Sequence, residues 1–262
     1  MIRILVLARM VWLELFRRKD PYVLLLVLAA LLGALLSFNI FGLGSLVRYI
    51  EDSGLLLTWL LSWVLAVQLA GRQLPQEETR HTIFSLVAKP ITRAELIVGK
   101  WLGAWLAAAA GTALLYAATW LAVALRGGDF GCAMLAQTLL LHLCFLAVVT
   151  ALAIALSTGL TLSAATTLAY LLSGAGYFLA VRLPAMAEGA APLKANVLLA
   201  LYYAAPHLEL FDLRQRLVHE WGPIPAGVLL GLVGDALLWT AGLLLLAWLV
   251  YRRRRFTRGE MT

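Results

Sequence analysis

Long apolar stretches alternate with short polar segments along this chain. Six windows of roughly twenty apolar residues, the length at which an α-helix crosses the hydrocarbon core of a bilayer, predict six membrane spans. The predicted spans cover residues 22–41, 54–74, 96–125, 132–156, 161–183 and 225–251. The pattern therefore predicts an all-α polytopic membrane protein that forms one membrane domain over residues 1–262.

A shorter pattern at the start of the chain predicts an interfacial helix over residues 1–20. Four of its charged side chains fall on one arc of about 100° of a helical wheel: those of Arg3, Glu14, Arg17 and Arg18. Such a helix lies along the membrane surface with its basic face towards lipid headgroups. The alternative, an extension of the first span, is disfavoured by Asp20-Pro21, because the residue before a proline is pushed out of helical geometry.

The connection between the fifth and sixth spans, residues 184–224, has no stretch long enough to cross a bilayer. Its apolar run is about ten residues long, roughly half of what a span requires. A Pro-, Ala- and Gly-rich linker precedes that run, and the amphipathic sequence HLELFDLRQRLVHEW, residues 207–221, follows it. We expect one or two short helices that cover the outer mouth of the bundle.

Composition also indicates a membrane protein. The chain is 63% hydrophobic and 13% charged, whereas about a quarter of the residues of soluble proteins are charged. It carries 21 Lys and Arg against 14 Asp and Glu, a formal net charge of +7. The basic residues flank apolar spans, so their excess indicates contact with membrane lipid and not with nucleic acid.

The distribution of Lys and Arg predicts the orientation of the spans. Fifteen of them lie before residue 20, within 72–100 or in the basic tail 252–262, and the six others lie on the opposite side of the predicted membrane. Basic residues accumulate on the cytoplasmic side. We therefore expect both termini and the 72–100 segment in the cytoplasm, and the protein in the inner membrane of a bacterial cell.

Residues 72–100 form a charged segment between the second and third spans, which hydrocarbon does not tolerate. We predict a short helix across the cytoplasmic surface at residues 77–87, with apolar side chains Ile83, Phe84 and Leu86 and polar side chains Glu77, Glu78 and Arg80. Thr92 and Glu95 then have the capping-box spacing that starts the third span. A surface helix held between two spans suits the transmission of motion from a soluble partner. An ordinary solvated loop is the alternative.

The same segment carries a family resemblance. Thr82-Ile83-x-x-Leu86-x-x-Lys89-Pro90-Ile91-Thr92-Arg93, followed by Gly99-Lys100, resembles the signature of ABC-2-type ABC transporter permeases. The N-terminal surface helix, the six spans and the long connection before the sixth span are similar to that family's layout. The pattern is most similar to the permeases linked to multicopper-enzyme maturation and nitrous-oxide-reductase assembly. His81 departs from the signature, which usually has glycine there.

The resemblance implies an all-α permease subunit of an ATP-driven exporter. Its partners would be two copies of a cytoplasmic ABC ATPase and a second permease subunit, either an identical chain or a related one. The cytoplasmic coupling helix would contact the ATPase through Glu77, Glu78, Arg80, Ile83, Phe84, Leu86 and Arg93. The resemblance leaves the cargo open.

The chain has no nucleotide-binding motif of its own. A phosphate loop requires a glycine five residues before Gly99 and a Ser or Thr after Lys100, but Ala94 and Trp101 stand there. We therefore predict no enzyme activity, no catalytic residue and no cofactor. We predict no metal site either, because the spacing of the acidic and imidazole side chains outside the spans matches no ligand pattern; these are His207, Glu209, Asp212, His219 and Glu220.

Two ionisable residues are predicted near the middle of the membrane, His142 in the fourth span and Asp235 in the sixth. A charge at that depth is costly, so each side chain is expected to face the bundle interior, a partner or water. They either pair, line a transport pathway or make internal hydrogen bonds that fix helix packing. An ion-coupled secondary transporter that uses both residues is one alternative to an ABC permease, and a non-transporting membrane assembly factor is another.

Overall fold

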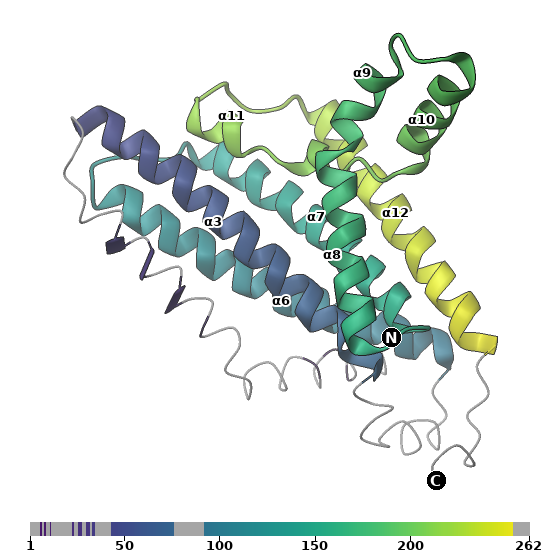
Figure 1. Ribbon diagram of the computed structural model, residues 1–262. Helices are drawn as coiled ribbons and strands as arrows, with labels where there is room; N and C mark the ends of the chain where they lie inside the picture. Colours follow the sequence, from purple (N-terminus) through teal and green to yellow (C-terminus); the bar gives the residue numbers. More distant parts are fainter. Residues whose placement is uncertain are drawn as a thin grey trace.

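The computed structural model describes residues 43–75 and 92–253, with ten isolated positions between residues 6 and 34. Helices make up all the regular structure in these residues (Figure 1). The long helices are α3 (Leu43–Gly71), α6 (Arg93–Ala124), α7 (Cys132–Ser157), α8 (Leu162–Phe178) and α12 (Ala226–Arg253). The short helices between α8 and α12 are η1 (Ala180–Arg182), α9 (Leu183–Ala187), α10 (Pro192–Ala204), η2 (Leu208–Phe211) and α11 (Arg214–Val218). The all-α prediction is confirmed for the described residues.

Within the described residues, four helices are long and apolar enough to cross a membrane. They run over Val47–Pro75, Arg93–Ala124, Cys132–Ser157 and Ala226–Arg253, and they correspond to four of the predicted spans. The first begins earlier than the predicted residue 54. Charged residues suggested a loop before that point, but α3 runs back to Leu43 through Glu51, which is buried, and Asp52, which accepts a hydrogen bond from Gln215.

The remaining predicted elements are shorter than expected or lie outside the described residues. The predicted fifth span, 161–183, is helical as α8 only to Phe178, and a 3-10 turn and α9 follow. The 17 residues of α8 are at the lower limit for crossing a bilayer. The interfacial helix 1–20 and the first span 22–41 lie outside the described residues apart from the isolated positions, and the coupling helix 77–87 lies wholly outside them.

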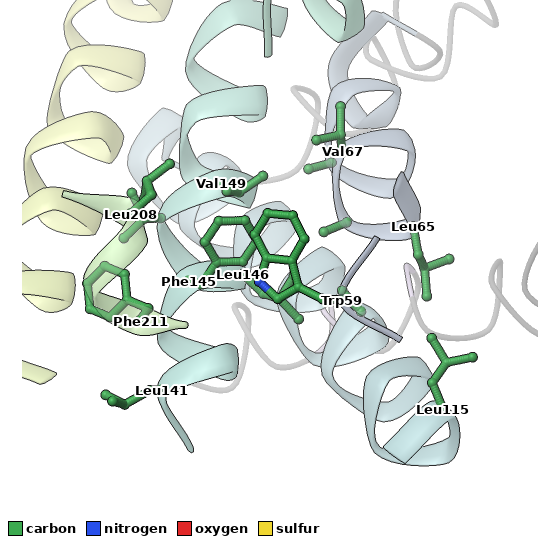
Figure 2. Packing of buried hydrophobic residues seen from close by; sticks show 14 of the residues in the cluster. Trp59, Leu65, Val67, Leu115, Leu141, Phe145, Leu146, Val149, Leu208 and Phe211 are labelled. Atoms are coloured by element: carbon green, nitrogen blue, oxygen red, sulfur yellow. The ribbon is translucent and has the colours of Figure 1, made fainter. Parts of the chain in front are cut away.

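Helix α7 occupies the centre of the bundle. It packs against α3, α6, α8 and α12, which lie around it (Figure 1). Its sequence explains this position, because apolar side chains cover the whole circumference of α7 and such a helix is stable when neighbours bury every face. Phe145, Leu146 and Val149 of α7 lie in the core with Trp59 of α3 (Figure 2).

Two tryptophans fasten α6 to α7. The indole N–H groups of Trp101 and Trp105 donate to the main-chain carbonyls of Ala147 and Leu143, at 3.2 and 3.0 Å. The two indole rings stack with their centres 5.9 Å apart and their planes 9° from parallel. Because each N–H has a partner, the two large side chains are placed between apolar helices without an unsatisfied donor.

Gly103 is a point of close contact between α6 and the N-terminal part of the chain. Ala8 and Val11 are buried, and a Cβ atom at Gly103 would lie 2.7 Å from the Cβ of Val11. Gly103 belongs to a Gly-x-x-x-Gly spacing, which favours close helix approach. Gly231 of α12 belongs to a second such pair, but a Cβ atom there would meet nothing within 4 Å. The absence of a side chain at Gly103 thus lets the N-terminal part of the chain pack closely against α6.

The connection between α8 and α12 has two parts in different environments. Helices α9 and α10 project from one end of the bundle and bury no side chain (Figure 1). Residues 208–218 instead enter the bundle, where Leu208, Phe211 and Leu217 belong to the core. Short helices are present between residues 184 and 224, but they are more numerous than the one or two expected. The predicted amphipathic surface helix over 207–221 is wrong. That segment forms η2 and the five-residue α11, whose apolar side chains fill the space between α3, α7 and α8.

Candidate functional site

At one end of the bundle, the first turn of α6 is hydrogen-bonded to the last turn of α12. Thr92 accepts a hydrogen bond from the Glu95 amide at 3.2 Å, and the Glu95 carboxylate accepts one from the Thr92 amide at 2.8 Å. This is the predicted capping box. Directly after it, Nη1 of Arg93 donates to the carbonyls of Tyr251 and Arg252, at 2.9 and 2.6 Å. Arg93 thus satisfies carbonyl groups that the end of a helix leaves without a helical partner.

In the sequence, the predicted coupling segment lies between the end of α3 and the start of α6. Helix α3 finishes on this side of the bundle and α6 starts here (Figure 1), and the start of α6 lies beside the end of α12. Arg93 is described, and its guanidinium is directed to α12. The other residues assigned to ATPase contact lie outside the described residues: Glu77, Glu78, Arg80, Ile83, Phe84 and Leu86.

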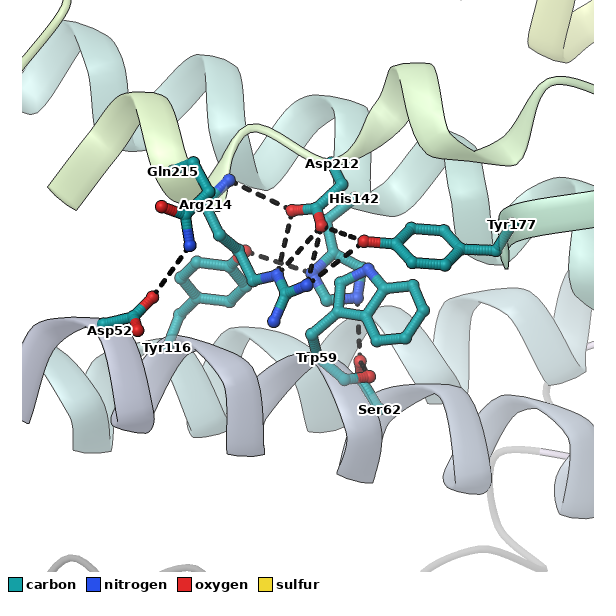
Figure 3. A network of polar contacts seen from close by, with 9 residues as sticks. All are labelled: Asp52, Trp59, Ser62, Tyr116, His142, Tyr177, Asp212, Arg214 and Gln215. Carbon is teal, nitrogen blue, oxygen red and sulfur yellow. Dashed lines mark hydrogen bonds and ion pairs between the residues drawn. The ribbon is translucent and has the colours of Figure 1, made fainter. Parts of the chain in front are cut away.

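Towards the opposite end, Asp212 and Arg214 form a buried ion pair (Figure 3). Nη2 of Arg214 lies 2.7 Å from Oδ2 of Asp212, and its Nε lies 2.9 Å from Oδ1. The Asp212 side chain is 10% exposed and that of Arg214 is 13% exposed. The Tyr177 hydroxyl of α8 donates to the same carboxylate. Such two-pronged pairing is strong and directional, and it holds the two charged side chains together within the 208–218 segment. The bonds of Tyr177 to Asp212 and of Arg214 to Tyr177 fix that segment against α8.

The surroundings of this pair keep both groups ionised. Burial raises the pKa of Asp212, but the hydrogen bonds and charge of Arg214, with the hydrogen bond of Tyr177, outweigh burial and hold the pKa below its ordinary value. Burial lowers the pKa of Arg214, and the hydrogen bond and charge of Asp212 raise it by more. A buried pair offsets its desolvation only when its hydrogen bonds are well formed, and these contacts meet that condition.

Aromatic and polar side chains continue the network into the bundle (Figure 3). The guanidinium carbon of Arg214 lies 5.1 Å from the ring centre of Trp59, within reach of a cation–π interaction. Deeper in the bundle, Nε2 of His142 lies 2.7 Å from the Ser62 hydroxyl, and Nδ1 lies 3.0 Å from the Tyr116 hydroxyl. A neutral imidazole donates from one nitrogen and accepts at the other. The network therefore joins α3, α6, α7 and α8 to the 208–218 segment.

Comparison with known protein families adds a decisive observation to this geometry. A profile described as ABC-2 family transporter protein matches residues 20–258, which is most of the chain. The chain belongs to the ABC-2 transporter family. A search of curated proteins found no match. This ABC-2 permease is a multi-pass membrane domain without ATPase activity, and permeases of its family typically pair with an ATPase subunit.

In this permease, His142 and Asp235, the two ionisable residues predicted near the middle of the membrane, do not contact each other. Both ring nitrogens of His142 are taken up by Ser62 and Tyr116. Asp235 of α12 is half-buried, and it has no hydrogen bond or ion pair with another described residue. Of the alternatives for these two residues, a pair of His142 with Asp235 does not occur in the structure. The alternative prediction, an internal hydrogen bond that fixes helix packing, is confirmed for His142.

Neither the ion pair of Asp212 with Arg214 nor the hydrogen-bond partners of His142 were predicted from the sequence. Asp212 was considered only as a metal ligand, although its neighbours Phe211 and Leu213 are apolar and Arg214 follows two positions later. Such a pair of opposite charges within an apolar run was a usable signal. Ser62 gave no such signal, because sequence spacing indicates its depth in the membrane but not the helix that it faces. Among the described residues, no group of three His, Cys, Asp or Glu is placed to hold a metal ion.

Proposed function

We propose that this permease is one subunit of an exporter driven by a separate cytoplasmic ATPase. Two permease subunits, identical or related, with six spans and an interfacial N-terminal helix in each, bind two ATPase subunits. Both termini lie in the cytoplasm of a bacterial cell, and the complex lies in its inner membrane. Export and the likeness to permeases of metalloenzyme assembly rest on the sequence resemblance.

The single observation that carries this proposal is the bond between Arg93 and the end of α12. Residues 76–91 connect the end of α3 with the start of α6, and Arg93 joins that start to Tyr251 and Arg252 at 2.9 and 2.6 Å. A displacement of residues 76–91 therefore acts on three helix ends together. Such an arrangement suits a membrane domain that receives mechanical work at one short segment.

The contact with the ATPase is proposed on the helix at residues 77–87. Ile83, Phe84 and Leu86 supply an apolar surface, and the side chains of Glu77, Glu78 and Arg80 surround it. An apolar patch with a charged rim is the usual composition of a specific protein interface. Arg93 belongs to the same functional unit, and we propose that it transmits the movement to α12.

The alternative of an ion-coupled secondary transporter has less support. A proton relay requires ionisable groups that exchange a proton with each other or with water. His142 instead has hydroxyl partners on both nitrogens inside the core, where it is 2% exposed. Asp235 lies apart from it on α12. No contact among the described residues connects the two into a relay.

Site-specific photo-cross-linking tests the proposal. A photo-reactive amino acid replaces Phe84, or replaces Leu193 of α10 at the opposite end as the matched control. We expect position 84 to cross-link in cells to a soluble protein that binds ATP, and position 193, which is 79% exposed, to give no such product. The proposal fails if position 84 yields no ATP-binding partner, or if the same partner appears at position 193.

A further inference from the structure

We propose that a cavity near the end of the bundle opposite Arg93 is a binding site for a small organic cation, an aliphatic amine or a guanidinium compound. Its volume is about 480 Å³, within the range of pockets for small molecules, about 300–1,000 Å³. Three parts of the chain line it: α3 at Glu51, residues 129–134 around the start of α7, and the end of α11 with the residues that follow it, between 217 and 223. This site is separate from the proposed ATPase contact.

The chemistry of the cavity wall favours a positive ligand with apolar groups. Three carboxylates line it, from Glu51, Asp129 and Glu220, and the residues that line it include no Lys or Arg. Phe130 and Met134, both buried, add an aromatic ring and a thioether. An ammonium or guanidinium group pairs with carboxylates, and its alkyl part packs on apolar side chains. The ring of Phe130 also suits a cation.

Glu51 is the strongest single indication of a ligand. The residue is 8% exposed, and its side chain forms no hydrogen bond or ion pair with another described residue. Arg48 attracts it electrostatically without forming an ion pair, and Glu220 repels it. Gly128, whose Cβ would lie 3.4 Å from Oε1 of Glu51, brings no side chain to it. A carboxylate without a partner is costly to bury. A cation bound in the cavity supplies the positively charged partner that the described residues do not provide.

Glu220 occupies a main-chain position that favours glycine. Its φ is +52°, and it follows α11 in a Schellman motif, in which the Trp221 amide donates to the Arg216 carbonyl at 3.2 Å and the Glu220 amide to the Leu217 carbonyl at 3.4 Å. Glycine is the usual residue there. The carboxyl side chain therefore stands at a position that disfavours any side chain, and it lines the cavity.

The ligand is an organic cation and not a bare metal ion. Metal binding requires several ligand atoms within about 2–2.6 Å of one point. Among the described residues, no three His, Cys, Asp or Glu side chains are grouped closely enough to hold a metal. Separated carboxylates around a cavity of this size instead match a longer molecule that carries charge at more than one point.

Cys132 provides a reporter for occupancy, because it is exposed and lines the cavity. The full-length chain with Cys144→Ser, in nanodiscs of zwitterionic lipid, leaves Cys132 as the reactive thiol. The measured quantity is the rate of its reaction with N-ethylmaleimide. We expect saturating spermidine or agmatine to slow this reaction at least fivefold. Magnesium chloride at the same ionic strength should leave the rate unchanged.

Two variants test whether the carboxylates hold the ligand. Glu51→Gln and Glu220→Gly should each raise the spermidine concentration for half-protection at least tenfold. Glu220→Gly also introduces the preferred residue at that turn, so its melting temperature should equal or exceed that of the parent. Glu188→Gln removes an exposed carboxylate away from the cavity. In this variant, spermidine should protect Cys132 at the same concentration as in the parent.

Three results would overturn the proposal. The first is an unchanged Cys132 rate with both spermidine and agmatine. The second is equal protection by magnesium chloride, which would show screening of charge instead of occupancy. The third is parent-like protection in both Glu51→Gln and Glu220→Gly, since the cation would then bind elsewhere.

Discussion

Nη1 of Arg93 lies 2.9 Å from the carbonyl oxygen of Tyr251, across 158 positions of the sequence. This contact connects the residue that begins α6 with the last turn of α12, directly beside the segment that we propose binds the ATPase. It also explains why an arginine follows the helix cap: its guanidinium reaches two neighbouring carbonyls of another helix, a geometry that suits its fork of donors.

The first prediction concerns this contact. Arg93→Ala removes hydrogen bonds from a charged donor, which contribute about 1.5–3 kcal/mol each when well shielded and less here because the site is partly exposed. We expect a loss of about 1.5 kcal/mol, or a fall in melting temperature of about 3–6 °C. The ATPase subunit should remain bound to the permease, but the permease should increase its rate of ATP hydrolysis by less than in the parent. Thermal unfolding and ATPase assays of the purified complex measure these effects.

Arg253→Ala is the matched control for Arg93→Ala. It removes one positive charge from the same end of α12, but Arg253 is exposed and has no hydrogen bond with another described residue. Its melting temperature should stay within about 1 °C of the parent. Equal effects of the two substitutions would mean that net charge, and not the link to α12, stabilises this end.

The second prediction concerns the dependence of stability on pH. The pKa of Asp212 in the folded protein lies below its ordinary value of 3.8. The stability that the ion pair contributes is therefore complete above that value, and it is lost only as the pH falls through the folded pKa. Between about pH 7 and about pH 5 this pair should leave the melting temperature of the parent unchanged.

Arg214→Met should reverse that behaviour. Removal of one partner from a buried ion pair costs about 3–5 kcal/mol. Burial, which has the largest effect on the pKa of Asp212, is then opposed only by the hydrogen bonds from Tyr177 and from the main chain of residue 214, and it raises that pKa. An acid whose folded pKa exceeds its unfolded pKa loses stability as the pH rises. The melting temperature of the variant should therefore increase when the pH is lowered from about 7 to about 5. Thermal unfolding in detergent at the two pH values measures this shift.

The double variant Asp212→Asn, Arg214→Met provides the control for the sign of the effect. It lacks the titrating carboxylate, so its melting temperature should be the same at both pH values. If Arg214→Met alone were as stable as the parent at about pH 7, the contacts of Arg214 with Asp212 and Tyr177 could not hold the 208–218 segment as described.

The third prediction concerns Gly103. A methyl group there would lie 2.7 Å from the Cβ of Val11 and 3.0 Å from the main-chain Cα of Ala8, so Gly103→Ala forces the two segments apart. Overpacking of this kind costs about 1–3 kcal/mol. Gly231→Ala, where a Cβ meets nothing within 4 Å, should be neutral or slightly stabilising. Limited proteolysis of the N-terminal segment and thermal unfolding would distinguish the two, and equal behaviour would contradict the contact.

Local signals in the sequence predicted the parts of the fold that depend on local physics. Four of the apolar windows became long helices because length and hydropathy alone decide whether a helix can span a bilayer. The cap formed by Thr92 and Glu95 was equally predictable, since both partners lie within one turn. Contacts between distant segments were not predictable in this way.

The 208–218 segment and His142 illustrate that limit. Leu208, Phe211 and Leu217 read as the apolar side of a surface helix, and their burial depends on the space that α3, α7 and α8 leave between them. The position of His142 in the middle of a long apolar helix was predictable, but its partners depend on how α3 and α6 are rotated about their axes. Hydropathy carries no information on that rotation, so the sequence suggested Asp235 as a partner and gave no indication of Ser62.

Purification of the tagged chain from its native membrane tests the central claim most directly. The measurement is the stoichiometry of any ATP-hydrolysing protein that accompanies the permease, with and without Phe84→Asp, and with Phe84→Leu as the conservative control. We predict one ATPase subunit for each permease chain in the parent and in Phe84→Leu, and its loss in Phe84→Asp with an unchanged melting temperature of the permease. A native particle that moves cargo without an associated ATPase and without nucleotide consumption would contradict this account.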